Sequence, residues 1–505
     1  MATVQFLPSF SLFFPHKQQL KVLFVTTEAA PFAKVGGLGE IMRTLPAALR
    51  KRGVDARVFL PKYGSANLER FPLKKIADGL RFVSDKEDPH GLFVANILEH
   101  RLESDGGTVY FLENMEFFEK RANVYGYADD QIRWIYLSQG VLEFLRISSW
   151  VPDVIVANDW QTAFAVDFLK HQYAKDQVLS KIASVYAIHN LHFQSMHDHH
   201  FVSESDYDAG QAQIPHYNDP RLLLLNGARR GILWSDAIVA VSPTYAKEIL
   251  TQDFGEGLHD LLQEKRSRLF GILNGLDYGY WNPKTDARLT ANFSANTLSE
   301  RAKNKRAVQE KFNLDVNPDK FLIGIVSRMD EQKGFDLIMQ VAESLFDNVD
   351  FQMVAIGNGD NKYRLFFQDL EKKFPGRFGG HYSYDDVLPP LIFGGADAML
   401  IPSRFEPCGL VQLEAMRYGS VPIVRKVGGL ADSVCDFDGE RGTGFVFSKF
   451  DPSALLIAVV RAREAFNNKN LWHGIVTRAM KKDFSWDRSA AEYERVLKIA
   501  VANHQ

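Results

Sequence analysis

The sequence has little cysteine. Only Cys408 and Cys435 occur among 505 residues, and neither lies in a CxxC pair. A disulfide framework and a cysteine-based zinc site are therefore not expected. This usage favours a reducing compartment, and we expect a cytoplasmic protein, with a plastid as the less favoured alternative.

The sequence also lacks long apolar runs and a charge bias. Its formal net charge is -3, and no basic block stands out, so we expect no nucleic-acid partner. No run of 18 uncharged apolar residues occurs, so we expect no membrane span. Residues 1–20 are apolar and interrupted by Pro8 and Pro15. Without a basic start or an A-x-A site they do not resemble a signal peptide, and we interpret them as an N-terminal extension.

What is present is a repeated alternation of apolar strands and helical segments. A chain of this length favours two or more domains. Short apolar runs, each followed by a helical segment, are typical of parallel β-α-β units. The first series of predicted strands covers residues 21–26, 56–60, 109–112, 153–157, 184–188 and 236–241. The second series covers residues 321–326, 351–356, 398–401 and 421–424.

The two series predict an α/β protein with two Rossmann-like domains that face each other across a cleft. Ligands of such open parallel sheets bind beyond the carboxyl ends of the strands. We expect an N-terminal domain at 21–268 and a C-terminal, nucleotide-sugar-binding domain at 269–482. Residues 483–505 are expected to cross back onto the first domain.

A glycine loop follows the first predicted strand. Gly36, Gly37 and Gly39 precede a predicted helix, and Lys34 adds a positive charge. Glycines let a backbone approach a phosphate, and the start of a helix offers free N–H groups. A simple tight turn is the alternative interpretation, because the loop matches neither GxGxxG nor a Walker motif.

Two cations follow the first strand of the second series. Arg328 and Lys333 lie where such a sheet binds ligands, and they would stabilise a departing nucleoside diphosphate. Solvated surface charge is the alternative. No Asp-rich metal motif is present, and we expect neither a metal ion nor a cofactor.

The third group of candidate residues is a carboxylate pair with a second glycine loop. Glu406 precedes a helix start expected near Cys408 and Gly409, and Glu414 would lie nearly two turns along that helix. One carboxylate would face a sugar and the other a ribose; a helix-terminal carboxylate and a surface glutamate are the alternative. Gly428 and Gly429 open another predicted helix on the opposite side of the expected cleft.

Long motifs in this chain resemble those of the glycogen/starch synthase family, the retaining glycosyltransferases of the GT-B fold. They occur in family order over roughly residues 20 to 500, at positions 27–39, 60–64, 241–246, 273–277, 402–410, 417–419 and 428–432. The resemblance implies a donor of ADP-glucose, or less often UDP-glucose. It implies an acceptor at the non-reducing end of an α-1,4-glucan, and retention at the anomeric carbon.

The resemblance also implies roles for individual residues. Catalytic positions are Glu406, Arg328, Lys333 and Gln161. Positions implied to bind the nucleotide sugar are Lys34, Gly36, Gly37, Asn226, His189, Tyr384, Cys408, Gly409, Leu410, Glu414, Gly428 and Gly429. Tyr384 matches a tyrosine that stacks near the adenine, and Asn226 matches an asparagine at the donor sugar.

The chain departs from the family pattern at four places. Gln161 stands where the family usually has a histidine, Glu40 replaces an aspartate, and Glu414 replaces a tyrosine. Residues 226–229 also differ from the usual Asn-Phe-Leu-Lys. Gln161 bears on catalytic activity, because the family histidine contacts the donor glucose and glutamine cannot carry a positive charge there. Glu414 bears on the preference for adenine.

A histidine-rich segment resembles a metal-binding tract at first sight. His192, His197, His199 and His200 lie close together, but no cysteine or carboxylate completes a tetrahedral set, so we expect no metal there. His189 fits the family position near the donor. A satisfied histidine at a strand end is the alternative.

Three functions remain open from the sequence. The favoured one is an active glucan synthase without a protein nucleophile, in which the departing phosphate accepts the proton of the acceptor. The others are a GT-B transferase that uses UDP-glucose or a small acceptor, and a catalytically weak paralogue that binds glucan. The sequence does not specify the oligomeric state.

Overall fold

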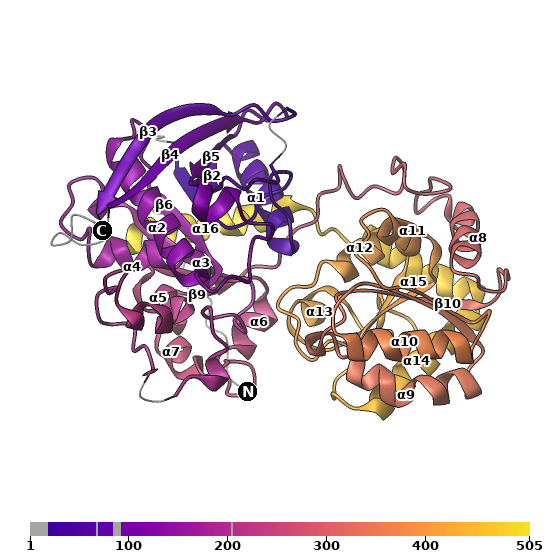
Figure 1. Ribbon diagram of the computed structural model, residues 1–505. Helices are drawn as coiled ribbons and strands as arrows, with labels where there is room; N and C mark the ends of the chain where they lie inside the picture. The colour runs from indigo at the N-terminus through magenta and orange to yellow at the C-terminus, as the bar shows by residue number, and fades with distance from the viewer. Residues whose placement is uncertain (1–18, 67–68, 84–91, 204–205, 505) are drawn as a thin grey trace.

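Two α/β lobes lie side by side in the computed structural model (Figure 1). The structure describes residues 19–66, 69–83, 92–203 and 206–504. The predicted N-terminal extension falls outside this range except for Gln19 and Leu20. No helix of the described residues is long and apolar enough to cross a membrane.

The first lobe contains a nine-stranded sheet of order β3-β4-β5-β2-β1-β6-β7-β8-β9. From β5 to β9 every neighbouring pair is parallel, and all of these strands except β9 were predicted from apolar runs. Its strands are β1 (Lys21–Val25), β2 (Asp55–Pro61), β3 (Lys74–Val83), β4 (Leu92–Arg101), β5 (Thr108–Glu113), β6 (Val154–Asn158), β7 (Ala183–Ile188), β8 (Ala237–Ala240) and β9 (Leu269–Gly271).

Three strands of this sheet were not predicted: the short β9 and the two edge strands β3 and β4, whose pattern differs. β3 and β4 pair antiparallel at the edge of the sheet, and β4 continues antiparallel to β5. Polar residues such as Lys74, Lys75 and Asp78 interrupt β3. An antiparallel edge can leave one face in water, so its strands need no continuous apolar run.

The second lobe contains a six-stranded, all-parallel sheet of order β12-β11-β10-β13-β14-β15. The four predicted strands of this series are confirmed. The short strands β12 and β15, at one edge each, were not predicted. The strands are β10 (Phe321–Val326), β11 (Phe351–Ile356), β12 (Phe378–His381), β13 (Ala398–Ile401), β14 (Val421–Arg425) and β15 (Phe445–Phe447).

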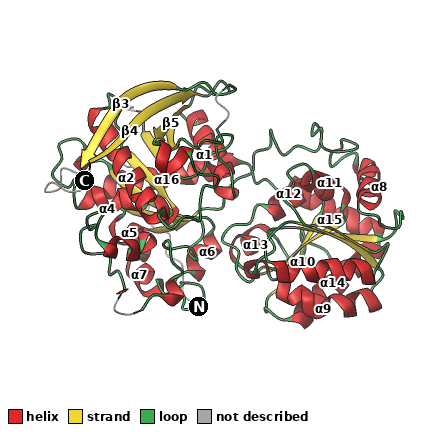
Figure 2. Ribbon diagram, in the orientation of Figure 1, coloured by secondary structure: helices red, strands yellow, loops and turns green. Residues whose placement is uncertain are grey.

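Helices flank both sheets, as Figure 2 shows. In the first lobe they are α1 (Gly37–Lys51), α2 (Asp130–Ile147), α3 (Asp159–Thr162), α4 (Phe164–Lys170), α5 (Gly227–Trp234), α6 (Pro243–Glu248) and α7 (His259–Glu264). In the second they are α8 (Arg301–Lys311), α9 (Phe335–Asn348), α10 (Asn361–Lys373), α11 (Leu388–Gly395), α12 (Val411–Arg417), α13 (Gly428–Ser433), α14 (Pro452–Asn467) and α15 (Lys469–Lys481).

The last helix, α16 (Trp486–His504), returns to the first lobe. Trp486, Tyr493 and Leu497 belong to the hydrophobic core of that lobe, while Phe484 belongs to the core of the second. The first sheet also extends to β9, three residues beyond the boundary predicted at 268. We propose that the first lobe comprises residues 21–271 together with α16.

The topology brings functional loops to equivalent places in the two lobes. β1 lies between β2 and β6, and β10 lies between β11 and β13. In each case the connections to the two neighbouring strands run to opposite sides of the central strand. This arrangement opens a crevice at the carboxyl end of that strand. The first glycine loop follows β1, and the loop with Arg328 and Lys333 follows β10.

Candidate functional site

A buried carboxylate organises the first glycine loop. Glu28 Oε2 accepts hydrogen bonds from the amides of Val35 at 2.6 Å and Gly36 at 2.9 Å. Tyr125 donates its hydroxyl to Glu28 Oε1 at 2.7 Å. No side chain caps the start of α1 at Gly37. The two loop amides are therefore engaged by the protein itself, and the first turn of α1 remains for a ligand.

The glycine loop touches the second lobe. A Cβ at Gly37 would lie 3.5 Å from Leu410 Cδ1, which is an ordinary contact. Lys34 reaches Glu40 at 3.6 Å and remains 43% exposed. The fold thus brings Lys34, Gly36 and Gly37 to the segment that carries Glu406 and Leu410, as the sequence predicts.

Lys333 and Glu406 form a largely buried pair in the second lobe. Lys333 Nζ donates to Glu406 Oε2 at 2.7 Å, and Ser403 Oγ donates to the same oxygen at 3.0 Å. The pair joins the loops after β10 and β13, which are neighbouring strands. A lysine ammonium has three N–H donors, so two remain for a ligand.

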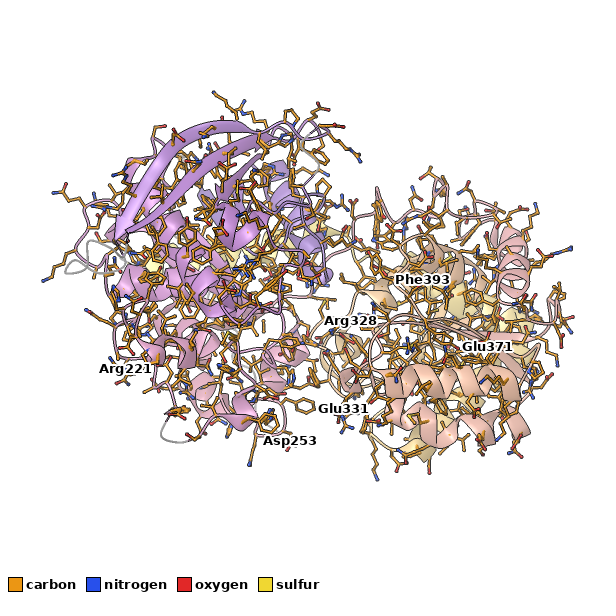
Figure 3. All side chains as sticks on the ribbon, in the orientation of Figure 1. Arg221, Asp253, Arg328, Glu331, Glu371 and Phe393 are labelled. Carbon is orange, nitrogen blue, oxygen red and sulfur yellow. The ribbon has the colours of Figure 1, made fainter. Side chains whose placement is uncertain are left out.

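Arg328 is more exposed than Lys333. Its side chain is 58% exposed and its guanidinium lies 3.2 Å from Asp330. Figure 3 shows Arg328 and Glu331 on the part of the second lobe that faces the first. Arg328 is therefore free to turn toward an anion without breaking a buried contact.

The second glycine loop requires glycine for steric reasons. Gly428 has a φ of +41°, and a Cβ there would lie 1.9 Å from the carbonyl oxygen of Glu406. A Cβ at Gly429 would lie 1.9 Å from the carbonyl oxygen of Cys408. The Gly428 amide donates to the carboxylate of Glu248 at 3.0 and 3.1 Å, so a side chain of the first lobe engages this loop.

Cys408 is not a nucleophile in this arrangement. Burial raises the pKa of its thiol to about 12, so the neutral thiol persists at physiological pH. Gly409 has a φ of +69°, which favours glycine at the turn before α12. These two residues shape the loop between Glu406 and Leu410.

Neutral polar groups line the carboxyl ends of β6 and β7. His189 Nε2 lies 2.9 Å from Asn158 Oδ1, and Asn158 uses its amide nitrogen on the carbonyl of Val25. Nε2 is therefore the donor, and His189 Nδ1 is an acceptor. Burial lowers the pKa of His189 to about 4, which keeps the ring neutral.

Two acceptors in this region have no hydrogen-bond partner among the described residues. They are His189 Nδ1 and Gln161 Oε1, both buried. An unpaired buried acceptor costs about 1–3 kcal/mol, so such atoms indicate a missing donor. Sugar hydroxyls are donors of this kind. Next to Gln161, burial raises the pKa of Asp159 to about 7, against the hydrogen bonds that it accepts from the amides of His189 and Asn190.

Glu414 lies in α12, but the helix begins later than predicted. It starts at Val411 rather than near Cys408, so Glu414 is in the first turn and not nearly two turns along. Burial raises the pKa of Glu414 to about 8, while the positive charge of Lys34 lowers it.

Two other predicted residues contribute less clearly. The Asn226 side chain is used within the protein: Oδ1 accepts from the amide of Arg229 at 2.9 Å, and Nδ2 donates to Gln194 at 2.8 Å. Tyr384 is 68% exposed. Their roles at the sugar and the adenine remain predictions.

A cavity of about 970 Å³ lies elsewhere, between the first lobe and the segments that join the two lobes. It is lined by α1 residues such as Met42 and Ala47, by residues 276–279 and by Trp486. None of the predicted site residues lines it, so we do not assign it to the donor.

Sequence reasoning missed Glu28, Glu248 and Asn158 as organising residues. Each acts on atoms far away in the sequence or on backbone amides, so no local motif identified its role. The expectation about the histidine-rich segment is wrong in one respect: a carboxylate, Glu256, lies among His192, His199 and His200.

Comparisons with known proteins agree with this geometry. A family model described as starch synthase catalytic domain matches residues 21–264, and one described as glycosyl transferases group 1 matches residues 308–467. Two facing lobes with these site loops define a GT-B glycosyltransferase.

The similarity to curated proteins extends over nearly the whole chain. The glycogen synthase of Clostridium novyi is 40% identical over 94% of this chain and 98% of its own length. That of Thermotoga maritima is 39% identical over 96% of this chain and 99% of its own. The chain belongs to the glycogen/starch synthase family and is a retaining glucosyltransferase.

Solved structures show the same architecture. The catalytic domain of starch synthase IV from Arabidopsis thaliana, bound to ADP and acarbose, aligns with a TM-score of 0.84 and 32% identity. The alignment covers 96% of this chain and all of that one. Sucrose-phosphate synthase from Thermosynechococcus elongatus, at 17% identity and a TM-score of 0.59, shares the fold.

Proposed function

We propose that this protein transfers glucose from ADP-glucose to the non-reducing end of an α-1,4-glucan with retention of configuration. The observation that carries the proposal is the arrangement around the lobe boundary. Lys333 and Arg328 offer positive charge on the second lobe, and Gln161 and His189 offer neutral acceptors on the first. A nucleotide sugar has the matching halves, an anionic diphosphate and a sugar rich in hydroxyl donors.

The cations act on the leaving group. The bond between the anomeric carbon and the diphosphate oxygen breaks, and negative charge grows on that oxygen. Lys333 uses its two remaining N–H groups and Arg328 turns inward to stabilise this charge. Glu406 holds the Lys333 ammonium in place and faces the glucose.

The neutral groups act on the sugar. Gln161 and His189 accept hydrogen bonds from glucose hydroxyls, and Lys34 with the first turn of α1 contacts the diphosphate from the first lobe. The departing phosphate oxygen takes the proton of the acceptor hydroxyl as the new bond forms on the same face. The protein supplies position and charge, and no side chain forms a bond to glucose.

The remaining predicted contacts lie toward the nucleoside. We propose that Glu414 accepts a hydrogen bond from the ribose and that Tyr384 stacks near the adenine. The protonated form of Glu414, which its pKa of about 8 favours at neutral pH, can donate as well as accept. Residues 408–410, Gly428 and Gly429 form the backbone wall beside Glu406.

The direct test is glucosyl incorporation into glycogen, with radiolabelled ADP-glucose and UDP-glucose assayed in parallel. We expect incorporation mainly from ADP-glucose, and release of the label by an α-1,4-specific hydrolase. Greater incorporation from UDP-glucose would overturn the donor assignment. Label that an α-1,4-specific hydrolase does not release would overturn the assigned linkage.

A second candidate function, a catalytically weak protein that binds glucan, is favoured by Gln161. Its buried, unpaired Oε1 stands where the family pattern has a histidine. Gln161→His separates the two functions. Little change in turnover supports the active synthase, whereas a large gain supports the weak paralogue.

A further inference from the structure

Three histidines of the segment after β7 converge on one carboxylate oxygen. His199 Nε2 lies 3.3 Å from Glu256 Oε2, and His192 Nδ1 and His200 Nε2 each lie 3.6 Å from the same atom. Glu256 comes from the turn between α6 and α7, where its φ of +49° is unusual for a residue with a side chain. The fold, rather than a sequence motif, assembles this group.

The three nitrogen–oxygen distances match the separation of neighbouring ligand atoms around a small cation. Zinc binds imidazole nitrogen and carboxylate oxygen at about 2.0–2.2 Å in tetrahedral sites, so neighbouring ligand atoms lie roughly 3.3–3.5 Å apart. The three nitrogen–oxygen distances fall at this separation or within about 0.3 Å of it. Hydrogen-bonded pairs would be closer, at about 2.7–3.2 Å.

The His199 ring makes no well-aligned hydrogen bond within the described residues. Both of its ring nitrogens are buried and have no hydrogen-bond partner among the described residues. A neutral imidazole has one donor and one acceptor, and leaving both unpaired in a protein interior is costly. A cation between His199 and Glu256 would use the lone pair of Nε2.

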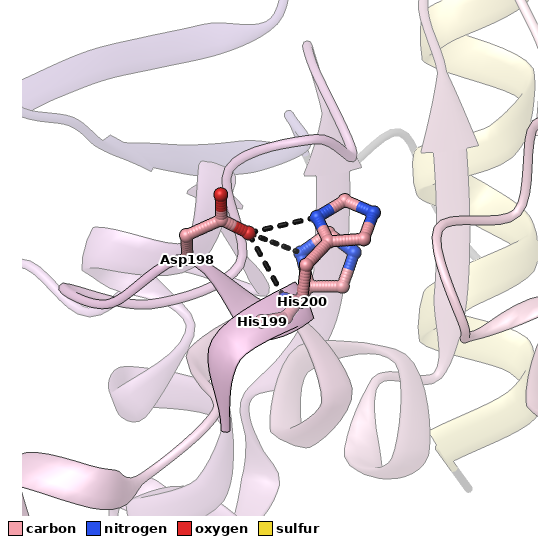
Figure 4. A group of neighbouring side chains, drawn as sticks. All are labelled: Asp198, His199 and His200. Atoms are coloured by element: carbon pink, nitrogen blue, oxygen red, sulfur yellow. Dashed lines mark hydrogen bonds and ion pairs between the residues drawn. The ribbon is translucent and has the colours of Figure 1, made fainter. Parts of the chain in front are cut away.

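A second carboxylate orients the rings from the other edge (Figure 4). Asp198 Oδ1 lies 2.8 Å from His200 Nδ1 and 3.9 Å from His199 Nδ1. Asp198, His199 and His200 together offer ligand atoms within 4.8 Å of one another. When His200 Nδ1 donates to Asp198, the lone pair of His200 Nε2 points toward Glu256. A carboxylate in the place of Asp198 is the usual outer partner of a metal-bound histidine.

We propose that His192, His199, His200 and Glu256 bind a Zn²⁺ ion, with Asp198 as the positioning residue for His200. Three imidazoles and one carboxylate favour Zn²⁺ over Mg²⁺ or Ca²⁺, which prefer oxygen ligands. All four residues belong to the first lobe, so the site does not need the donor or the acceptor.

The site adjoins the boundary between the lobes. The His192 ring lies 5.7 Å from the ring of Phe405, the residue before Glu406. In the same segment, Asn190 Nδ2 donates to Gln332 Oε1 at 3.4 Å, next to Lys333. A bound ion would fix the conformation of residues 192–200 and thereby the surface on which Phe405 rests.

The test measures binding of Zn²⁺ alone to chelator-treated protein by calorimetry, followed by Co²⁺ absorption spectroscopy. We expect one ion per chain and the intense visible bands of tetrahedral Co²⁺. Glu256→Gln, which nearly preserves shape, and His199→Ala should each weaken binding at least ~100-fold. Asp198→Asn should weaken it ~10- to 100-fold, as loss of an outer partner does.

His197→Ala is the matched control, because His197 lies in the same segment but is exposed. It should bind Zn²⁺ like the wild type. Thermal unfolding of each metal-free variant checks the fold, and His199→Gln replaces His199→Ala if the latter unfolds. The proposal is overturned if the wild type binds no stoichiometric Zn²⁺, or if Glu256→Gln and the His199 variants bind it as tightly as the wild type.

Discussion

The two lobes prepare their halves of the site in opposite ways. The second lobe holds charge in a paired form, with Lys333 bound to Glu406 at 2.7 Å. Apart from Lys34, the first lobe offers neutral groups, and Gln161 Oε1 and His189 Nδ1 have no hydrogen-bond partner among the described residues. Burying a charge in a protein interior is very costly unless the charge is paired. Burying a neutral acceptor without a donor costs only about 1–3 kcal/mol.

This difference explains how one boundary can recognise both halves of a nucleotide sugar. Stabilising the leaving diphosphate requires positive charge that is already in position. Removal of one such preorganised group greatly lowers the catalytic rate. The sugar needs many weak contacts, each worth about 0.5–1.5 kcal/mol. Mutations on the two lobes should therefore change the activity by different amounts.

The largest effect is expected for Lys333→Ala. Turnover should fall about 100- to 1000-fold, because the leaving diphosphate loses a positioned cation and Glu406 loses its partner. Steady-state kinetics with a saturating donor measure the effect. Lys362→Ala is the control, since Lys362 is 61% exposed and pairs with Asp336 on the surface. Wild-type turnover in Lys333→Ala would contradict the assigned role.

A pH-dependent effect on stability is expected for Glu414→Gln. The folded protein keeps the Glu414 proton up to a pKa of about 8, whereas the unfolded chain releases it near the ordinary glutamate pKa of 4.5. The free energy of unfolding of the wild type therefore falls as the pH rises between these values. The Glu414→Gln variant does not show this fall, because glutamine has no proton to release.

Denaturant unfolding of both proteins at several pH values measures this difference. Relative to its value at pH ~5, the variant should gain roughly 4 kcal/mol over the wild type by pH ~8.5. A stability difference that does not change with pH would show that Glu414 is ionised in the folded protein.

A steric effect of about 1–3 kcal/mol is expected for Gly429→Ala, because the new Cβ would overlap the carbonyl oxygen of Cys408. The free energy of unfolding measures it. Gly474→Ala is the matched control, since Gly474 is also helical and its Cβ would meet only the end of Arg478 at 3.3 Å. That variant should be neutral or more stable by up to ~1 kcal/mol. Equal destabilisation in both would contradict a tight loop beside Glu406.

The smallest effect is expected for Gln161→Ala on the first lobe. Losing one neutral hydrogen bond to the sugar should reduce kcat/KM about tenfold or less. Titration of kcat and KM separately shows whether the loss occurs in binding or in turnover. A loss as large as that of Lys333→Ala would remove the contrast between the lobes.

Local sequence features predicted much of this protein. Continuous apolar runs predicted the parallel strands, including β10, β11 and β13 at their observed bounds. The glycines after β1 and β14 predicted the two loops that face the boundary. These features depend on residues within about ten positions of one another, so a single sequence carries them. The edge strands β3 and β4 lacked such a run and were missed.

The pairing of distant groups was decided by the tertiary structure alone. Lys333 and Glu406 are 73 positions apart, and Glu248 and Gly428 are 180 positions apart. Glu256 reaches the histidines only through the turn after α6. The sequence determined which chemical groups this protein has and where most of its parallel strands lie. Only the packing of the two sheets decided which charges are paired and which acceptors are left open, because hydrogen bonds and ion pairs depend on distances in space and not along the chain.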